Sequence, residues 1–100
     1  MHTNSYIVLD NWDNMVQFYH QNDLSMAQIC RSLRGECKPF RRFNDNVDAS
    51  IRSTLRFLER RGILQQVGVR RRAGPTFIRV ENWQSIFMAF LERINNENTV

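Results

Sequence analysis

Apolar residues recur at helical spacing soon after the start of the chain. A single helical face is formed by Trp12, Met15, Val16 and Tyr19. This spacing predicts a helix capped by Asp10, with Asp13 in its first turn and an end at Asn22-Asp23. The short apolar segment Tyr6–Leu9 that precedes it fits both a strand and a helical lead-in, so its type stays open.

A second helix is predicted to start near Ser25. Gln28 stands three residues later, which is the spacing of a capping box, where each side chain binds the other residue's backbone N–H. Gly35 is a plausible left-handed stop after Arg34. The inward face of this helix would consist of Met26, Ile29, Cys30 and Leu33.

The segment Gly35–Asp45 continues neither helical pattern. It contains Pro39, two phenylalanines and three cations, and we read it as a loop, with one helical turn as an alternative. Phe40 and Phe43 are expected to hold it against the core. Arg41 and Arg42 would add to any basic surface nearby.

A third helix follows, with capping residues at Asn44, Asp45 and Asn46 and a favourable carboxylate at Asp48. Placing successive residues 100° apart separates two faces. The inward face contains Val47, Ile51, Thr54, Leu55 and Leu58. The outward face contains Ala49, Arg52, Ser53, Arg56 and Arg60.

After this helix the pattern changes to that of strands. Gly62 is expected to adopt the left-handed helix stop, after which Ile63 and Leu64 return to the core. Gln65–Arg71 and Thr76–Val80 then predict a hairpin with a basic turn around residues 72–75. Whether the first residues of the chain add a third strand stays open.

A last helix follows Asn82 and ends in a polar tail, Asn95–Asn98. It carries one wide apolar stripe made of Trp83, Ile86, Phe87, Phe90, Leu91 and Ile94. This stripe is either a dimer interface or the closure of the monomer's own core. The whole pattern predicts one domain over residues 1–100, mostly α with a small β-hairpin, in which residues 82–95 form the C-terminal helix.

Charge is segregated along the chain. Residues 31–79 contain thirteen cations and four acids, a net charge of +9, whereas the remaining residues contain one cation and six acids, a net charge of −5. Thirteen of the fourteen cations are arginine, whose planar fork suits phosphate oxygens and guanine edges. The central segment therefore favours a nucleic-acid partner, although a solvated basic face without a ligand would have the same composition.

The sequence gives less support to secreted, redox-regulated, metal-binding, enzymatic or membrane-spanning proteins. The two cysteines, Cys30 and Cys37, are expected to be reduced thiols, since secreted scaffolds of this size usually carry several pairs. A redox switch through them is a weaker alternative. The histidines have no zinc-ligand spacing, and no catalytic motif is present, so we expect no metal, no cofactor, no evident small-molecule ligand and no enzyme activity. Apolar runs are too short to span a membrane, which predicts a soluble cytoplasmic or nucleoid-associated protein.

The segment from Ile51 to Leu64, IRSTLRFLERRGIL, resembles the helix 3, glycine and first wing strand of winged helix-turn-helix regulators. This resemblance implies that the outer face of helix 3 enters the major groove of DNA while the wing follows the backbone or minor groove. The helix contacts would then be Asn46, Asp48, Ala49, Arg52, Ser53, Arg56 and Arg60. The wing contacts would be Arg70, Arg71 and Arg72.

The resulting hypothesis is a small, sequence-specific regulator that binds double-stranded DNA. The long Gly35–Asp45 connection departs from the usual short turn of a helix-turn-helix. Two alternatives remain open: a protein-interaction or assembly module, and an RNA-binding or DNA-replication accessory protein that uses the same surface.

Overall fold

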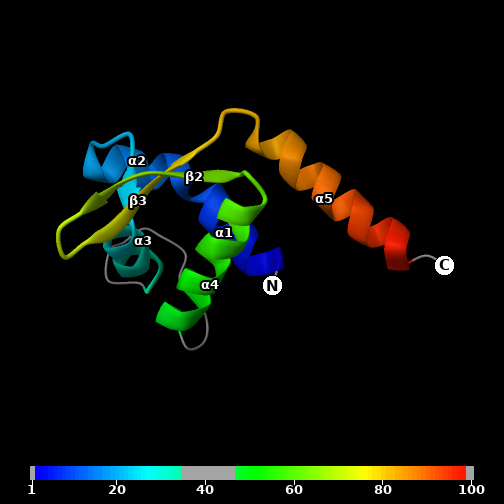
Figure 1. Cartoon of the computed structure of the whole chain (residues 1–100), viewed down its shortest axis with the longest axis horizontal. Coiled ribbons are helices and arrows are strands. Elements are labelled where there is room, and N and C mark those ends of the chain that lie inside the picture. The colour runs from blue at the N-terminus through cyan, green and yellow to red at the C-terminus, as the bar shows by residue number, and fades with distance from the viewer. Residues whose placement is uncertain (1, 35–46, 99–100) are drawn as a thin grey trace.

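A computed structural model describes residues 2–34 and 47–98 of the chain. These residues form five helices and a three-stranded antiparallel sheet (Figure 1). Residues 2–34 contain α1 (His2–Asp10), α2 (Trp12–Tyr19), β1 (Leu24–Ser25) and α3 (Met26–Leu33). The later elements are α4 (Val47–Arg60), β2 (Leu64–Arg70), β3 (Gly74–Arg79) and α5 (Trp83–Asn98). The fold is thus α+β, as the sequence predicted.

The open question about Tyr6–Leu9 is answered by α1, which contains this segment. Ile7, Val8 and Leu9 are all buried, and consecutive buried residues mean that α1 is covered on more than one side. The three consecutive buried residues show no helical periodicity, although Tyr6 and Asp10 on either side of them are exposed.

The predicted role of Asp10 as a helix cap is wrong, because Asp10 is the last residue of α1. The chain runs almost directly from α1 into α2 through Asn11, whose side-chain amide donates to the carbonyl of Ile7 at 2.8 Å. Asp13 lies in the first turn of α2 as expected. The helix ends earlier than predicted, because His20 adopts a left-handed conformation with φ 55° and terminates it.

The sheet has the strand order β1-β3-β2, so the hairpin strand β3 lies in its centre. The third strand is β1, where Leu24 is paired with Phe77 and Ser25 with Thr76, and not the N-terminal residues. The hairpin is confirmed with slightly different bounds, and its pairing shifts register between Gln66 and Gly68. A strand of two residues is too short to produce a detectable alternation, which explains why the sequence did not reveal β1.

The core lies between α1, α3, α4 and the sheet. The two predicted faces of α4 are confirmed wherever its side chains are described: Ile51, Thr54, Leu55 and Leu58 are buried. Gly62 has φ 76° and ends the helix, and Ile63 and Leu64 enter the core as expected. The sequence pattern therefore fixed the rotation of α4 about its own axis.

The last helix, α5, extends away from the body at the end opposite the hairpin turn (Figure 1). The prediction that Asn95–Asn98 form a polar tail after the helix is wrong, because α5 continues through these residues to Asn98. Polar residues continue a helix readily once several turns precede them, since propagation needs only one bond per residue. Within the described ranges, no helix is both long and apolar enough to cross a membrane.

Candidate nucleic-acid interface

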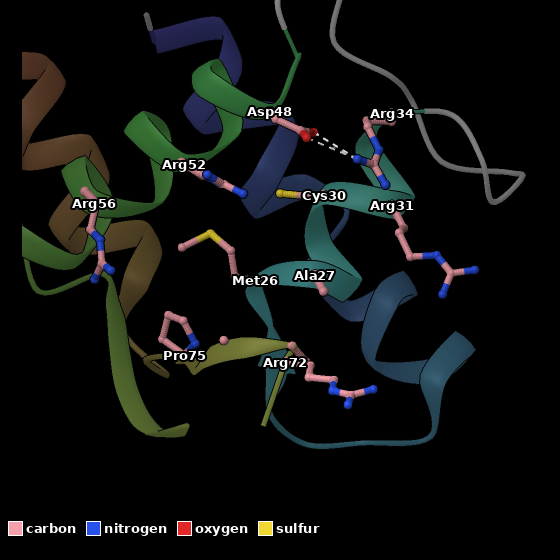
Figure 2. A pocket seen from close by; sticks show the side chains of 12 residues that line it. Met26, Ala27, Cys30, Arg31, Arg34, Asp48, Arg52, Arg56, Arg72 and Pro75 are labelled. Atoms are coloured by element: carbon pink, nitrogen blue, oxygen red, sulfur yellow. Dashed lines mark hydrogen bonds and ion pairs between the residues drawn. The ribbon is translucent and has the colours of Figure 1, made fainter. Parts of the chain in front are cut away.

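A cavity of about 460 Å³ lies between α3, α4 and the turn of the β2–β3 hairpin (Figure 2). Its apolar wall includes Met26, Ala27, Cys30 and Pro75. Five arginines line it, namely Arg31, Arg34, Arg52, Arg56 and Arg72. The cavity therefore joins cations from three elements that are far apart in sequence, and we call it the arginine cavity.

The outer face of α4 forms one side of this region. Ala49, Arg52, Ser53, Arg56 and Arg60 are all exposed, in agreement with the predicted face. Arg56 also forms an exposed ion pair with Glu59 at 3.0 Å. Such an i,i+3 surface pair contributes little stability, so Arg56 can leave Glu59 at small cost when a stronger anion approaches.

Asp48 has a structural partner near the start of α4. Nη1 of Arg34 lies 3.2 and 3.1 Å from the two oxygens of its carboxylate. This pair connects the C-terminal end of α3 to the first turn of α4. Asp48 was predicted to contact bases or to favour the helix N-terminus, and the ion pair with Arg34 adds a role in joining the two helices.

The hairpin turn presents Arg71 and Arg72, which are both exposed. Arg72 has φ 69°, a left-handed conformation that is uncommon for a residue with a long side chain. The turn is held against α3, because the backbone N–H of Ala27 donates to the carbonyl of Ala73 at 3.1 Å. Position 72 is therefore fixed beside the first turn of α3 and near α4.

Arg70, which was predicted to be a wing contact, has a different environment. Its Nη2 forms an ion pair with Asp23 at 3.0 Å, and its Nη1 donates to the side chains of Gln21 and Gln28 at 2.9 and 3.0 Å. The same oxygen of Gln28 also accepts from the backbone of Ser25 in the capping box. Arg70 thus joins the end of β2 to the start of α3.

Cys30 is buried at the wall of the arginine cavity, and its thiol lies near the guanidinium of Arg52. Burial, assisted by the charge of Asp48, raises the pKa of this thiol, whereas Arg52 and Arg34 act in the opposite direction. The raised pKa keeps the side chain a neutral thiol near pH 7. A neutral thiol argues against a redox switch built on a reactive thiolate.

The apolar stripe of α5 is used partly by the protein's own core. Phe87 is buried, and the core also receives the partly buried side chains of Trp83, Ile86, Phe90 and Leu91. Phe57 and Phe90 meet edge to face at 5.2 Å, with the guanidinium of Arg61 4.4 Å from the Phe90 ring. Ile94 remains half-buried and Met88 is exposed. The monomer's own core therefore uses most of the stripe.

Three predicted contact residues, Asn46, Arg41 and Arg42, lie outside the described residues. So do Cys37, the proposed stop at Gly35, the capping candidates Asn44 and Asp45, and the two phenylalanines of the loop.

Sequence reasoning missed the contribution of α3 to the arginine cavity. Ala27, Arg31 and Arg34 are spaced by four and three residues, so they share one side of the helix. This spacing was a usable signal, because it places two cations on the face next to the buried one. The connection between that face and the hairpin turn depends on β1, which the sequence did not reveal.

Comparison with known proteins gives no match to a family model, to a curated protein or to a solved structure.

Proposed function

We propose that this chain is a sequence-specific double-stranded DNA-binding protein of the winged helix-turn-helix class, acting as a small transcriptional regulator. The observation that carries the proposal is the arginine cavity, where the outer face of α4 and the hairpin turn meet. A helix and a hairpin that present cations to one side match the way such proteins approach a duplex, with the helix in the major groove and the wing on the backbone.

The order of elements also supports this class. From α2 to β3 the chain runs helix, strand, helix, helix, strand, strand, and the short first strand is paired with the last one. In this arrangement α4 is the recognition helix and the β2–β3 hairpin is the wing. The cations that reach DNA are Arg52, Arg56 and Arg60 on the helix and Arg71 and Arg72 on the wing.

The two groups of cations have different tasks. Arg52 and Arg56 stand beside Ala49 and Ser53, small side chains that allow a helix to approach base edges closely. Their replacement by alanine lowers affinity and also blunts discrimination between sites. Arg71 and Arg72 lie on the turn and contact phosphate, so their loss lowers affinity for all sequences alike.

The test is selection of bound duplexes from a random pool, followed by competition between the selected duplex and structured RNA. Enrichment of one duplex motif supports the proposal. Equal competition by RNA favours the RNA-binding alternative, and no binding to either nucleic acid favours the protein-interaction module. If about six to eight phosphates are neutralised, affinity falls on the order of a thousandfold between low and moderate salt.

We place the homodimer interface of this regulator on α5. One side of the helix has a basic groove that contains Arg61 and Arg93. The other side has a groove that contains Asp10, together with Asp13, which is paired there with Arg79. In a two-fold dimer the basic groove of each copy meets the acidic groove of the other. The exposed side chain of Met88 lies in the acidic groove and provides apolar area for the contact.

Sedimentation at micromolar concentration tests this interface. The wild-type protein sediments as a dimer, and Met88→Glu shifts it to a monomer because a carboxylate enters the apolar contact. Gln65→Glu, an exposed position on β2, is the matched control and leaves the dimer intact. A strictly monomeric wild-type protein refutes the interface.

A further inference from the structure

We propose that the arginine cavity is a binding site for a single phosphate-type oxyanion, held chiefly by Arg52 and Arg72. The proposal concerns a defined small-anion site and goes beyond DNA binding, because it holds for a free phosphate group as well as for a phosphate of the duplex.

The charge balance of the cavity favours an anion. Five guanidinium groups line it, and the single carboxylate among the lining residues, Asp48, is bound by Arg34. Arg56 is paired with Glu59, which does not line the cavity, so the lining residues themselves carry an excess of positive charge. Among the described residues, Arg52 and Arg72 form no ion pair with a carboxylate. An oxyanion placed between them would offset the repulsion of neighbouring cations.

The two arginines stand on different elements that border the cavity. The side chain of Arg52 extends across the cavity toward Cys30 (Figure 2). The side chain of Arg72 starts at the rim, on the hairpin turn, and points away from Arg52 in this view, but it is exposed and can turn toward an anion. Cys30 does not neutralise Arg52, since burial raises the pKa of the thiol and keeps it uncharged. The planar fork of a guanidinium donates two parallel hydrogen bonds to the oxygens of a phosphate group.

The apolar wall strengthens the same interaction. Met26, Ala27 and Pro75 exclude water from one side of the cavity, and a lower local dielectric constant strengthens attraction between opposite charges. A volume of about 460 Å³ falls within the usual size of small-ligand sites, so a phosphate group with a small substituent fits. The site therefore favours a negatively charged ligand.

Titration of the full-length protein with inorganic phosphate, followed by ¹H–¹⁵N NMR at constant ionic strength, tests the site. We expect saturable shifts of the amides of Ala27, Cys30 and Ala73, which chloride does not reproduce. Arg52→Gln weakens phosphate binding at least roughly tenfold, as expected for loss of one charged hydrogen-bonding group. Gln65→Ala, an exposed position on β2 outside the cavity, is the control and changes it less than about twofold.

A second variant, Arg72→Gln, gives the same test from the hairpin side and keeps the proposal testable if Arg52→Gln fails to fold. Phosphate shifts no larger than those of chloride overturn the proposal, and so does wild-type phosphate binding by a folded Arg52→Gln or Arg72→Gln.

Two probes distinguish the sources of the anion. Methyl phosphate represents a free monoester and dimethyl phosphate represents the diester of a nucleic-acid backbone. Tighter binding of methyl phosphate indicates a small-molecule ligand, and equal or tighter binding of dimethyl phosphate indicates a backbone phosphate. Binding of either one above chloride supports the site, and binding of neither overturns it.

The same protein separates this proposal from the proposed function. Phosphate binding without any duplex binding leaves the site standing and removes the DNA-binding role. Duplex binding without phosphate binding removes the anion site and leaves the DNA-binding role standing. If both hold, inorganic phosphate lowers duplex affinity at constant ionic strength, because Arg52 and Arg72 serve both ligands.

Discussion

The last residue of β2 and the hairpin turn that follows it contain arginines in opposite environments, one bound by other side chains and the others exposed. Arg70, at the end of β2, is bound by Asp23, Gln21 and Gln28, whereas Arg72, two residues later, lies exposed at the arginine cavity. A run of three arginines in the sequence is therefore not one functional unit. Its first member stabilises the fold, and the other two carry the charge that the turn presents to a ligand.

Arg79 repeats this contrast on the other strand of the hairpin. Its guanidinium donates to the carbonyl of Leu9 at 2.8 Å and to Asp13 at 2.7 Å, and it lies 4.6 Å from the Trp83 ring. The net charge of the basic segment thus includes cations that serve as internal connectors. An anionic partner is expected at the exposed arginines, and not at those bound by other groups of the protein.

The largest expected effect comes from removing the exposed pair at the turn. Arg71→Ala with Arg72→Ala lowers duplex affinity roughly 100-fold, since each lost contact to a phosphate removes a charge-assisted hydrogen bond. Fluorescence anisotropy over a range of salt also shows a salt slope smaller by about two. Gln65→Ala, an exposed position on β2, is the control. An unchanged slope in the double variant would remove the turn from the interface.

The next effect concerns Arg70. Arg70→Ala lowers the free energy of unfolding by about 1 to 2 kcal/mol, because it leaves Asp23 and two glutamine side chains without their shared donor. Urea denaturation measures this loss. The salt slope of duplex binding stays unchanged in the folded variant. A smaller salt slope together with an unchanged free energy of unfolding would contradict the structural role of Arg70 and place it in the interface.

A smaller effect is expected at the capping box beside Arg70. Ser25→Ala destabilises the protein by about 1 kcal/mol, because the N–H of Gln28 loses the acceptor that lies 3.1 Å away. Denaturation of Ser25→Ala, Arg70→Ala and the double variant forms a double-mutant cycle. Because both side chains act through Gln28, we expect the two effects to be non-additive, and strict additivity would contradict a shared network.

The smallest effect at neutral pH concerns Cys30. Its pKa is raised above the usual value of 9.0 in the folded state, so the stabilising neutral thiol is present below pH 9 and is lost as pH rises through the raised value. Unfolding free energies measured from pH 7 to 11 therefore fall more steeply for wild type than for Cys30→Ala. The difference in slope is at most about 1.4 kcal/mol per pH unit.

Alkylation of Cys30 gives an independent check of its charge state. A buried neutral thiol reacts slowly with iodoacetamide at pH 7, and Arg52→Gln does not slow it much further. Rapid alkylation that depends on Arg52 would mean that a thiolate neutralises this arginine, which would weaken the case for an anion in the cavity.

Elements governed by local rules could be predicted from the sequence. The capping box of α3, the two faces of α4 and the left-handed Gly62 each depend on residues within one or two helical turns. The register shift at Gly68 and the strand β1 depend on pairing across the sheet, and no local pattern encodes them. The helix α1 escaped detection for a related reason, since burial on several sides removes its periodicity.

The candidate site divides in the same way. Exposure of Arg52, Arg56 and Arg72 followed from helical geometry and from the position of a turn. The partners of Arg34 and Arg70 did not, because Asp48 and Asp23 lie 14 and 47 residues away. Which arginine is bound internally is a property of tertiary packing, and composition alone assigns all of them to the ligand.

The left-handed backbone at Arg72 has a consequence for the evolution and engineering of this chain. A residue with a long side chain at φ 69° is disfavoured by about 1 kcal/mol relative to glycine. Selection for thermal tolerance alone would therefore replace Arg72 with glycine or asparagine, and the guanidinium at the cavity would be lost with it. If arginine persists at this position under such selection, its contribution to ligand binding outweighs the free energy of unfolding that glycine would add.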